Sequence, residues 1–169
     1  MSANSPFWIE STTPGRLAIL ARPRGGDWLE DDILEWKRAG IDTVVSLLTE
    51  DEVADLNLLE EERFTTSSGL QFHNFPIPDR EIPESRRETT EIATLLAGEI
   101  SNGRNIGFHC RQGVGRSALL AACVLIALGL PPEEASNRVS KARGLPTPET
   151  AEQKKFILDF ARTFFQVPV

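Results

Sequence analysis

The feature that most constrains this chain is the segment 117–130, which reads Ser-Ala-Leu-Leu-Ala-Ala-Cys-Val-Leu-Ile-Ala-Leu-Gly-Leu and is apolar almost all round. Its composition favours a helix, and a helix on the surface of a soluble protein would carry a polar face. The segment is also too short to cross a bilayer. It therefore predicts a central helix that other elements cover on every side.

Short apolar strands and amphipathic helices alternate along the rest of the chain. Strands are expected at 17–21, 41–48, 70–75 and 106–109, where apolar and β-branched residues gather. Helices are expected at 31–39, 51–59, 85–102 and 117–130, then from 131 onward and from 147 to 165. The acidic residues of the 50s and 60s are expected on solvated helix faces. This order predicts an α/β fold, a single domain over residues 1–169 with a core at roughly 14–165, in which helices flank a central, mostly parallel sheet.

Charge and cysteine usage limit the classes of function. The formal net charge of −7 argues against nonspecific binding to nucleic acid or to anionic membranes. The first residues lack a basic start and an apolar core, so neither a secretory signal nor membrane insertion is expected. Two cysteines, Cys110 and Cys123, are too few for a disulfide framework, and Cys123 is expected to be a small core residue. We therefore expect a cytoplasmic protein with reduced thiols, and a monomer.

One segment concentrates the residues that carry chemistry, and it lies between the strand at 106–109 and the apolar helix. It reads His109, Cys110, Arg111, Gln112, Gly113, Val114, Gly115, Arg116 and Ser117. Its two glycines allow a tight loop that turns its backbone N–H groups inward at a helix N-terminus. Such a nest binds a phosphate dianion.

The other side chains of this loop suit a phosphate ligand. A thiolate at Cys110 would be stabilised by the same positive field and would be nucleophilic at neutral pH. Arg116 has a planar fork that grips two phosphate oxygens, and the Ser117 hydroxyl can donate to the Cys110 sulfur. His109 is expected to orient the loop through ring N–H bonds to the backbone. Arg111 is either a solvated loop residue or a cation that strengthens the local potential.

The pattern of His-Cys, five residues and Arg-Ser resembles the signature of protein tyrosine and dual-specificity phosphatases. The chain looks most like their compact branch, the cyclin-dependent-kinase-inhibitor-type and bacterial dual-specificity enzymes. The resemblance implies that Asp79, at the end of the segment 75–79, is the general acid. It also implies that Gln153, which follows the similar segment 143–150, positions a water. From the residues alone, Asp79 would be a turn residue and Gln153 a polar residue on an amphipathic helix.

The predicted reaction is hydrolysis of a phosphate monoester in two steps. Cys110 attacks phosphorus, Asp79 protonates the leaving oxygen, and water then hydrolyses the phosphocysteine while Asp79 acts as base. Neither a metal nor an organic cofactor is expected, since the loop amides and Arg116 supply the electrostatic stabilisation. A phosphoprotein, with phosphotyrosine favoured, is the expected partner.

Several alternatives use the same residues. A phosphoinositide, inositol phosphate or RNA 5′-phosphatase would have the same loop, although lipid-specific relatives usually hold more lysines there. An inactive phosphate-binding module would keep the nest without turnover. Sulfur transfer of the rhodanese type and arsenate reduction also use a loop cysteine, but Cys123 is badly placed to be a second redox cysteine. Arg143 is as well suited to bracing the loop as to touching substrate.

Overall fold

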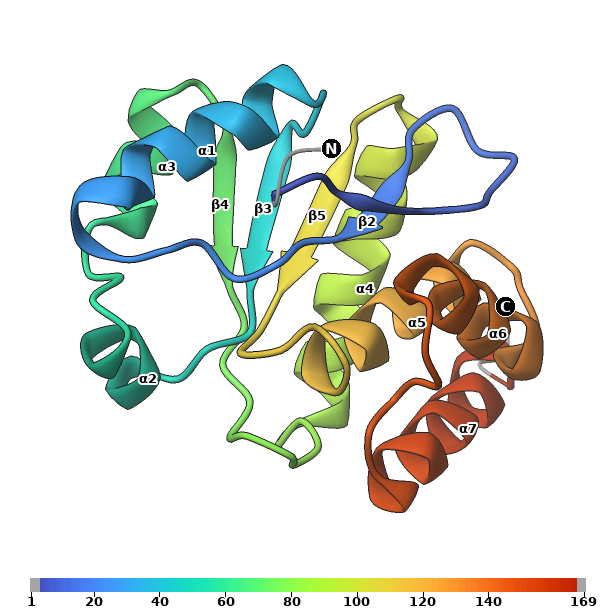
Figure 1. Ribbon diagram of the computed structural model, residues 1–169. Helices are drawn as coiled ribbons and strands as arrows, with labels where there is room; N and C mark the ends of the chain where they lie inside the picture. Colours follow the sequence, from blue (N-terminus) through green and yellow to red (C-terminus); the bar gives the residue numbers. More distant parts are fainter. Residues whose placement is uncertain (1–3, 167–169) are drawn as a thin grey trace.

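The computed structural model describes residues 4–166, with helices on both faces of one sheet (Figure 1). The strands are β1 (Phe7–Ile9), β2 (Leu17–Ile19), β3 (Thr43–Ser46), β4 (Gln71–Asn74) and β5 (Ile106–His109). The helices are α1 (Leu29–Arg38), α2 (Glu50–Asp55), α3 (Glu61–Ser67), α4 (Arg86–Ser101), α5 (Arg116–Ala127), α6 (Pro132–Arg143) and α7 (Ala151–Phe165), with a 3-10 helix at Gly26–Trp28.

The sheet has the strand order β1-β2-β5-β3-β4. The strands β2, β5, β3 and β4 run parallel, and β1 is antiparallel to β2, which confirms the predicted mostly parallel sheet. The register brings Ser46 level with Asn74 and with His109, so β3, β4 and β5 end at the same edge. The loops that follow these three strands therefore meet, at the edge where parallel sheets bind their ligands.

Two apolar cores hold the layers together. On one face of the sheet α1 and α3 pack around Ile33, Trp36 and Leu58. On the other face α4, α6 and α7 surround α5 (Figure 1). Every residue from 116 to 126 is buried, which confirms the predicted helix that is covered on all sides. Within it Cys123 is fully buried, and burial raises the pKa of its thiol, as expected of a core residue.

The acidic stretch after β3 differs from the sequence-based expectation. The helix expected at 51–59 ends early, because α2 stops at Asp55 and Asn57 has a φ of 58°. A second short helix, α3, follows from Glu61 and was not predicted. Left-handed backbone cannot continue an α-helix, so the chain turns there. The prediction of solvated acidic faces was wrong at Glu52 and Glu61, which are buried. Each of them pairs with a side chain of the β5–α5 segment, and local periodicity carries no information about so distant a partner.

A strand near the start of the chain escaped prediction. Although β1 has only three residues, it pairs with β2 along its whole length and adds an antiparallel edge.

Within residues 4–166, no helix is long and apolar enough to cross a membrane.

Candidate active site

The phosphate loop, residues 110–116, joins β5 to α5 at the edge where three parallel strands end. Gly113 has a φ of 72°, a conformation that L side chains rarely adopt, and its N–H donates to the Cys110 sulfur over 3.2 Å. At Gly115, a Cβ would lie 3.1 Å from the amide of Gln153 and 3.2 Å from the carboxylate of Glu149. Glycine at 115 thus lets two side chains approach the loop closely.

The predicted nucleophile, Cys110, has hydrogen-bond donors at its sulfur, and such donors stabilise a thiolate. The Ser117 hydroxyl lies 3.2 Å from the Cys110 sulfur, and the sulfur is also within 3.2 Å of the Gly113 nitrogen. Burial opposes the charged form, but the donors of Ser117 and Gly113 and the charge of Arg116 together lower the pKa of Cys110. The loop therefore favours the thiolate, which is the reactive form of the sulfur.

The guanidinium of Arg116 is the most densely bonded group of the site. Its side chain is 1% exposed, and its two terminal nitrogens donate to the Glu52 carboxylate at 2.5 and 2.9 Å. Further bonds reach the Ile77 carbonyl at 2.7 Å and the Asp79 carboxylate at 3.0 Å. Three segments far apart in the sequence thus hold one arginine in place.

Glu52 is the residue of the site that sequence reasoning missed. It occupies the third position of α2 and closes a capping box with Thr49. Burial opposes its ionisation, but the bonds from Arg116 and from the Thr49 N–H lower the pKa of Glu52 to about 2. The signal was present in the sequence, because Thr-x-x-Glu directly after a buried strand places a carboxylate at the ligand edge of the sheet.

The predicted general acid lies at the rim of the same site. Asp79 is half exposed and lines a hollow of about 230 Å³ together with Cys110 and Arg116. The next residue, Arg80, pairs across this hollow with Glu149, at 2.5 Å. The loop after β4 therefore brings the Asp79 carboxylate into the hollow that contains the nucleophile.

Two further arginines at the phosphate loop are hydrogen-bonded within the protein. Arg143 donates to the carbonyls of Gly113 and Gln112, each at 3.2 Å, so it braces the loop. Arg111 is partly exposed and donates to Glu52 at 3.2 Å. Val114 is half-buried.

Gln153 lies beside the loop, but its amide is engaged elsewhere. It forms a capping box with Thr150 at the start of α7, and its nitrogen donates to the Glu81 carbonyl at 3.0 Å. The side chain is fully buried against Gly115. It thus joins the loop after β4 to the phosphate loop.

The ring of His109 has a partner that the sequence did not predict. Nε2 contacts the carboxylate of Glu61 at 2.5 Å. Among the described residues, Nδ1 makes no hydrogen bond of ordinary geometry, although the backbone of Cys110 lies close enough to favour the charged ring. Sequence spacing gave no hint of this pair, because Glu61 begins a helix, α3, that the sequence analysis did not predict.

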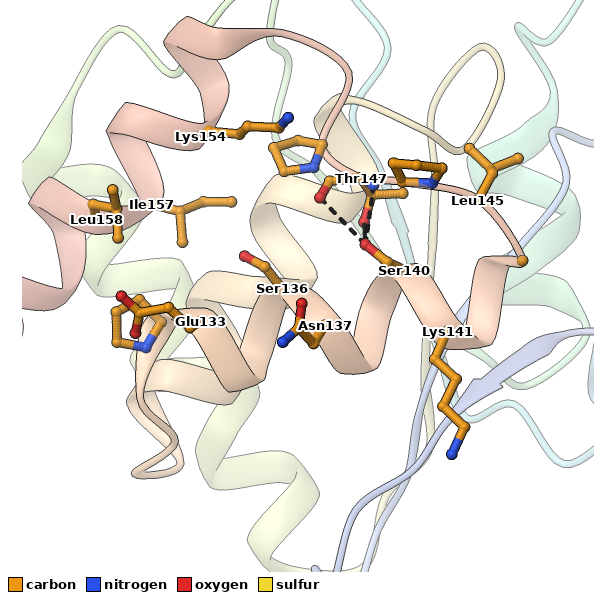
Figure 2. Close-up of a pocket in the computed structure, with 14 residues that line it drawn as sticks. Glu133, Ser136, Asn137, Ser140, Lys141, Leu145, Thr147, Lys154, Ile157 and Leu158 are labelled. Carbon is orange, nitrogen blue, oxygen red and sulfur yellow. Dashed lines mark hydrogen bonds between the residues drawn. The ribbon is translucent and has the colours of Figure 1, made fainter.

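A larger hollow, of about 750 Å³, lies between α6 and α7 (Figure 2). There the Ser140 hydroxyl is hydrogen-bonded to Thr147, and neither cysteine nor histidine lines the surface. Across the described chain, no group of three or more potential metal ligands gathers. The side chains suited to covalent chemistry are those of the phosphate loop.

Comparison with known proteins agrees with this geometry. The family model described as PTP-SAK, Swiss Army Knife protein, DSP-PTPase phosphatase domain matches residues 6–157. Cyclin-dependent kinase inhibitor 3 of Rattus norvegicus is 31% identical over 137 residues, and that of Homo sapiens is 30% identical over the same length. These matches cover 78% of this chain and 63% of each relative, so the chain spans less than two thirds of their length.

Solved structures resemble the whole fold. Kinase associated phosphatase, with its catalytic cysteine replaced by serine, gives a TM-score of 0.85 at 22% identity and covers 98% of both chains. Tk-PTP in its active form gives 0.77 at 25% identity, over 95% of this chain and 99% of the other. With the family match extending over residues 6–157, this chain belongs to the dual-specificity family of cysteine-dependent phosphatases.

Proposed function

We propose that the chain hydrolyses phosphate monoesters on proteins through a phosphocysteine intermediate. The observation that carries this proposal is the shared hollow of Cys110, Arg116 and Asp79, in which two donors already hold the sulfur. A nucleophile, an anion clamp and a proton donor are the groups that phosphoryl transfer to a thiol requires.

In the first step the phosphate occupies the nest of loop N–H groups, and Arg116 grips two of its oxygens. The Cys110 thiolate attacks phosphorus in line with the ester oxygen. Asp79 gives its proton to that oxygen as the P–O bond breaks, so the alcohol or phenol leaves neutral. The Ser117 hydroxyl remains at the sulfur and stabilises it as the leaving group of the second step.

In the second step water attacks the phosphocysteine, Asp79 accepts a proton from that water, and inorganic phosphate leaves as the Cys110 thiolate forms again. We assign alignment of the water to Gln153, supported by its position against Gly115. Its amide would have to exchange its bond with Glu81 for one to water.

The favoured substrate is a phosphoprotein, with phosphotyrosine preferred. The name of one relative, cyclin-dependent kinase inhibitor 3, supports a protein substrate. The preference for phosphotyrosine follows from the resemblance of the phosphate loop to that of protein tyrosine phosphatases. The other cations near the hollow are already paired, Arg111 with Glu52 and Arg80 with Glu149, which disfavours a polyphosphorylated headgroup. We place the protein in the cytoplasm, because a thiolate nucleophile needs a reducing compartment. We also propose that it is a monomer.

The proposal is tested by initial rates on phosphotyrosine, phosphoserine and phosphothreonine peptides, a phosphoinositide and a nucleotide. Wild-type protein and Cys110→Ser are compared, with Cys123→Ala as a matched control that removes the other thiol. We expect the highest kcat/KM on phosphotyrosine, a loss of about 10³-fold or more for Cys110→Ser, and little change for Cys123→Ala. Phosphate should still bind to Cys110→Ser, because the nest and Arg116 remain.

A second readout is the intermediate itself. Acid quenching during turnover, followed by peptide mass spectrometry, should find phosphate on Cys110. Turnover that survives in Cys110→Ser would remove this residue from the mechanism, and faster hydrolysis of the phosphoinositide than of the peptides would overturn the substrate preference.

A further inference from the structure

A buried carboxylate and a buried imidazole form a pair that the proposed mechanism does not use. The Glu61 residue is 2% exposed and His109 is 0% exposed, and the contact between Oε1 and Nε2 is 2.5 Å. Trp36 of α1 faces the imidazole with its ring centroid 5.8 Å away, so this side of the pair is dry. His109 directly precedes Cys110 in the chain, and the charge of the Cys110 thiolate acts on its ring.

A carboxylate in such a place is costly unless a cation or several donors compensate it. The partner of the Glu61 carboxylate is the His109 ring, and an ion pair results when that ring carries both of its protons. Burial works against a charged imidazole, but the charges of Glu61 and of the Cys110 thiolate outweigh it and raise the pKa of His109.

Two negatively charged groups act on the His109 ring. From α3 Glu61 acts on the ring, and from the phosphate loop the Cys110 thiolate acts on it. Glu62 lines a hollow of about 280 Å³ that Glu61 also borders, but it does not contact the ring. Two anions thus act on the imidazolium, and one of them is the predicted nucleophile.

We infer that Glu61 is a positioning residue: it holds His109 in the doubly protonated form, and the positive ring in turn keeps Cys110 as a thiolate. The inference rests on the proposed role of Cys110 as nucleophile. Glu61 itself touches no substrate, because the imidazole separates it from the phosphate loop. Its contribution is a fixed negative charge that acts on the sulfur through the His109 ring. This contribution adds to the hydrogen bonds that Ser117 and Gly113 make with the sulfur.

The test titrates the Cys110 thiol without turnover. Rates of alkylation by iodoacetamide are measured from pH 4 to 9, and peptide mass spectrometry distinguishes Cys110 from Cys123. Glu61→Gln keeps the size of the side chain and removes its charge, so the ring loses its second proton. We expect the midpoint of the titration to rise by about one pH unit, and alkylation below the midpoint to slow about tenfold.

Glu62→Gln is the matched control, since it removes an exposed carboxylate of the same helix, and its midpoint should equal that of wild type. In a His109→Gln background, Glu61→Gln should not raise the midpoint further, because the ring through which it acts is gone. A merely structural role for Glu61 would change the melting temperature of Glu61→Gln and leave the midpoint in place. An unchanged or lowered midpoint in folded Glu61→Gln overturns the inference.

A measurement on wild type covers the case in which Glu61→Gln does not fold. The chain has two histidines, so ¹H–¹⁵N NMR of the rings is simple to assign, with His73→Gln identifying the second signal. We expect the His109 ring to be doubly protonated at pH 7, and a neutral ring would overturn the inference. If wild-type Cys110 itself titrated like an ordinary thiol, the proposed function would fail first, so the two failures are distinguishable.

Discussion

Two carboxylates reach Arg116 from different surroundings, and their exposure separates their roles. The Glu52 side chain is 10% exposed and binds the guanidinium with both oxygens, whereas Asp79 is 51% exposed and uses one. A bidentate buried contact fixes the arginine. A single contact at the rim can be exchanged for substrate, which supports the proposed role of Asp79 as general acid.

Asp79→Asn removes that proton while keeping the shape of the side chain. We expect hydrolysis of phosphotyrosine and alkyl phosphates to slow by about 10²–10⁴-fold, because these oxygens leave poorly without a proton. Activated aryl phosphates should be affected much less.

The control is Glu81→Gln, an exposed carboxylate two positions further along the same loop, which should behave as wild type. Leaving-group dependence is read from kcat/KM on a series of aryl phosphates. An equal loss on good and poor leaving groups would assign the acid role to another residue and leave Asp79 a turn residue.

Glu52→Gln should weaken both the site and the fold. A displaced Arg116 should lower kcat/KM by about 10²-fold, and breaking one side of a buried ion pair costs about 3–5 kcal/mol of unfolding free energy. Glu50→Gln, an exposed carboxylate of the same helix, is the control.

The stability that Glu52 contributes should depend on pH in one direction. The pKa of Glu52 is lowered from an ordinary 4.5 to about 2, so its stabilisation is present above pH 4.5 and is lost as the pH falls towards 2. The melting temperatures of wild type and Glu52→Gln should therefore differ most near neutral pH and converge in acid. A constant difference would show that the ionised carboxylate is not what stabilises the fold.

At the level of elements, close backbone packing joins the start of β2 to the end of α4. A Cβ at Gly15 would lie 2.1 Å from the carbonyl oxygen of Arg104 and 2.8 Å from that of Ile100. Backbone atoms cannot move aside as the end of a side chain can. The junction between these two elements therefore requires glycine.

Gly15→Ala should destabilise the protein by about 1–3 kcal/mol, since overpacking forces the backbone apart. Gly98→Ala makes the same chemical change on the exposed side of α4, where nothing lies within 4 Å of the added Cβ, and it should stabilise by about 0.5–1 kcal/mol. Urea unfolding of the two variants measures both. Equal effects would show that the contact at Gly15 relaxes without cost.

The elements that sequence analysis predicted are those whose cause is local. The helix α5 is apolar on all sides, and the glycines of the phosphate loop and the prolines before Asp79 restrict their own backbone. Features fixed by distant partners were missed, such as the burial of Glu52 beside Arg116 and of Glu61 beside His109. The pairing of the short β1 with β2 also depends on tertiary contact and not on pattern.

At the scale of the molecule, an acidic chain places two arginines close together at one edge of the sheet. The net charge is −7, yet the phosphate loop carries Arg111 and Arg116 beside a helix N-terminus. Glu52 and Asp79 balance these charges in the ligand-free form. In the proposed mechanism, an arriving phosphate dianion therefore replaces a carboxylate at Arg116.

The partners of Arg116 also tie catalytic competence to the order in which the chain folds. Its guanidinium is bonded across 64 residues to Glu52, 39 to Ile77 and 37 to Asp79, so local helix formation cannot assemble the site. On refolding from urea, helical circular dichroism can return early, but phosphatase activity should return only with the fluorescence change that accompanies burial of Trp36. Trp8→Phe and Trp28→Phe remove the signals of the other two tryptophans. Activity that appears ahead of that signal would mean that the guanidinium works before its three distant partners have arrived.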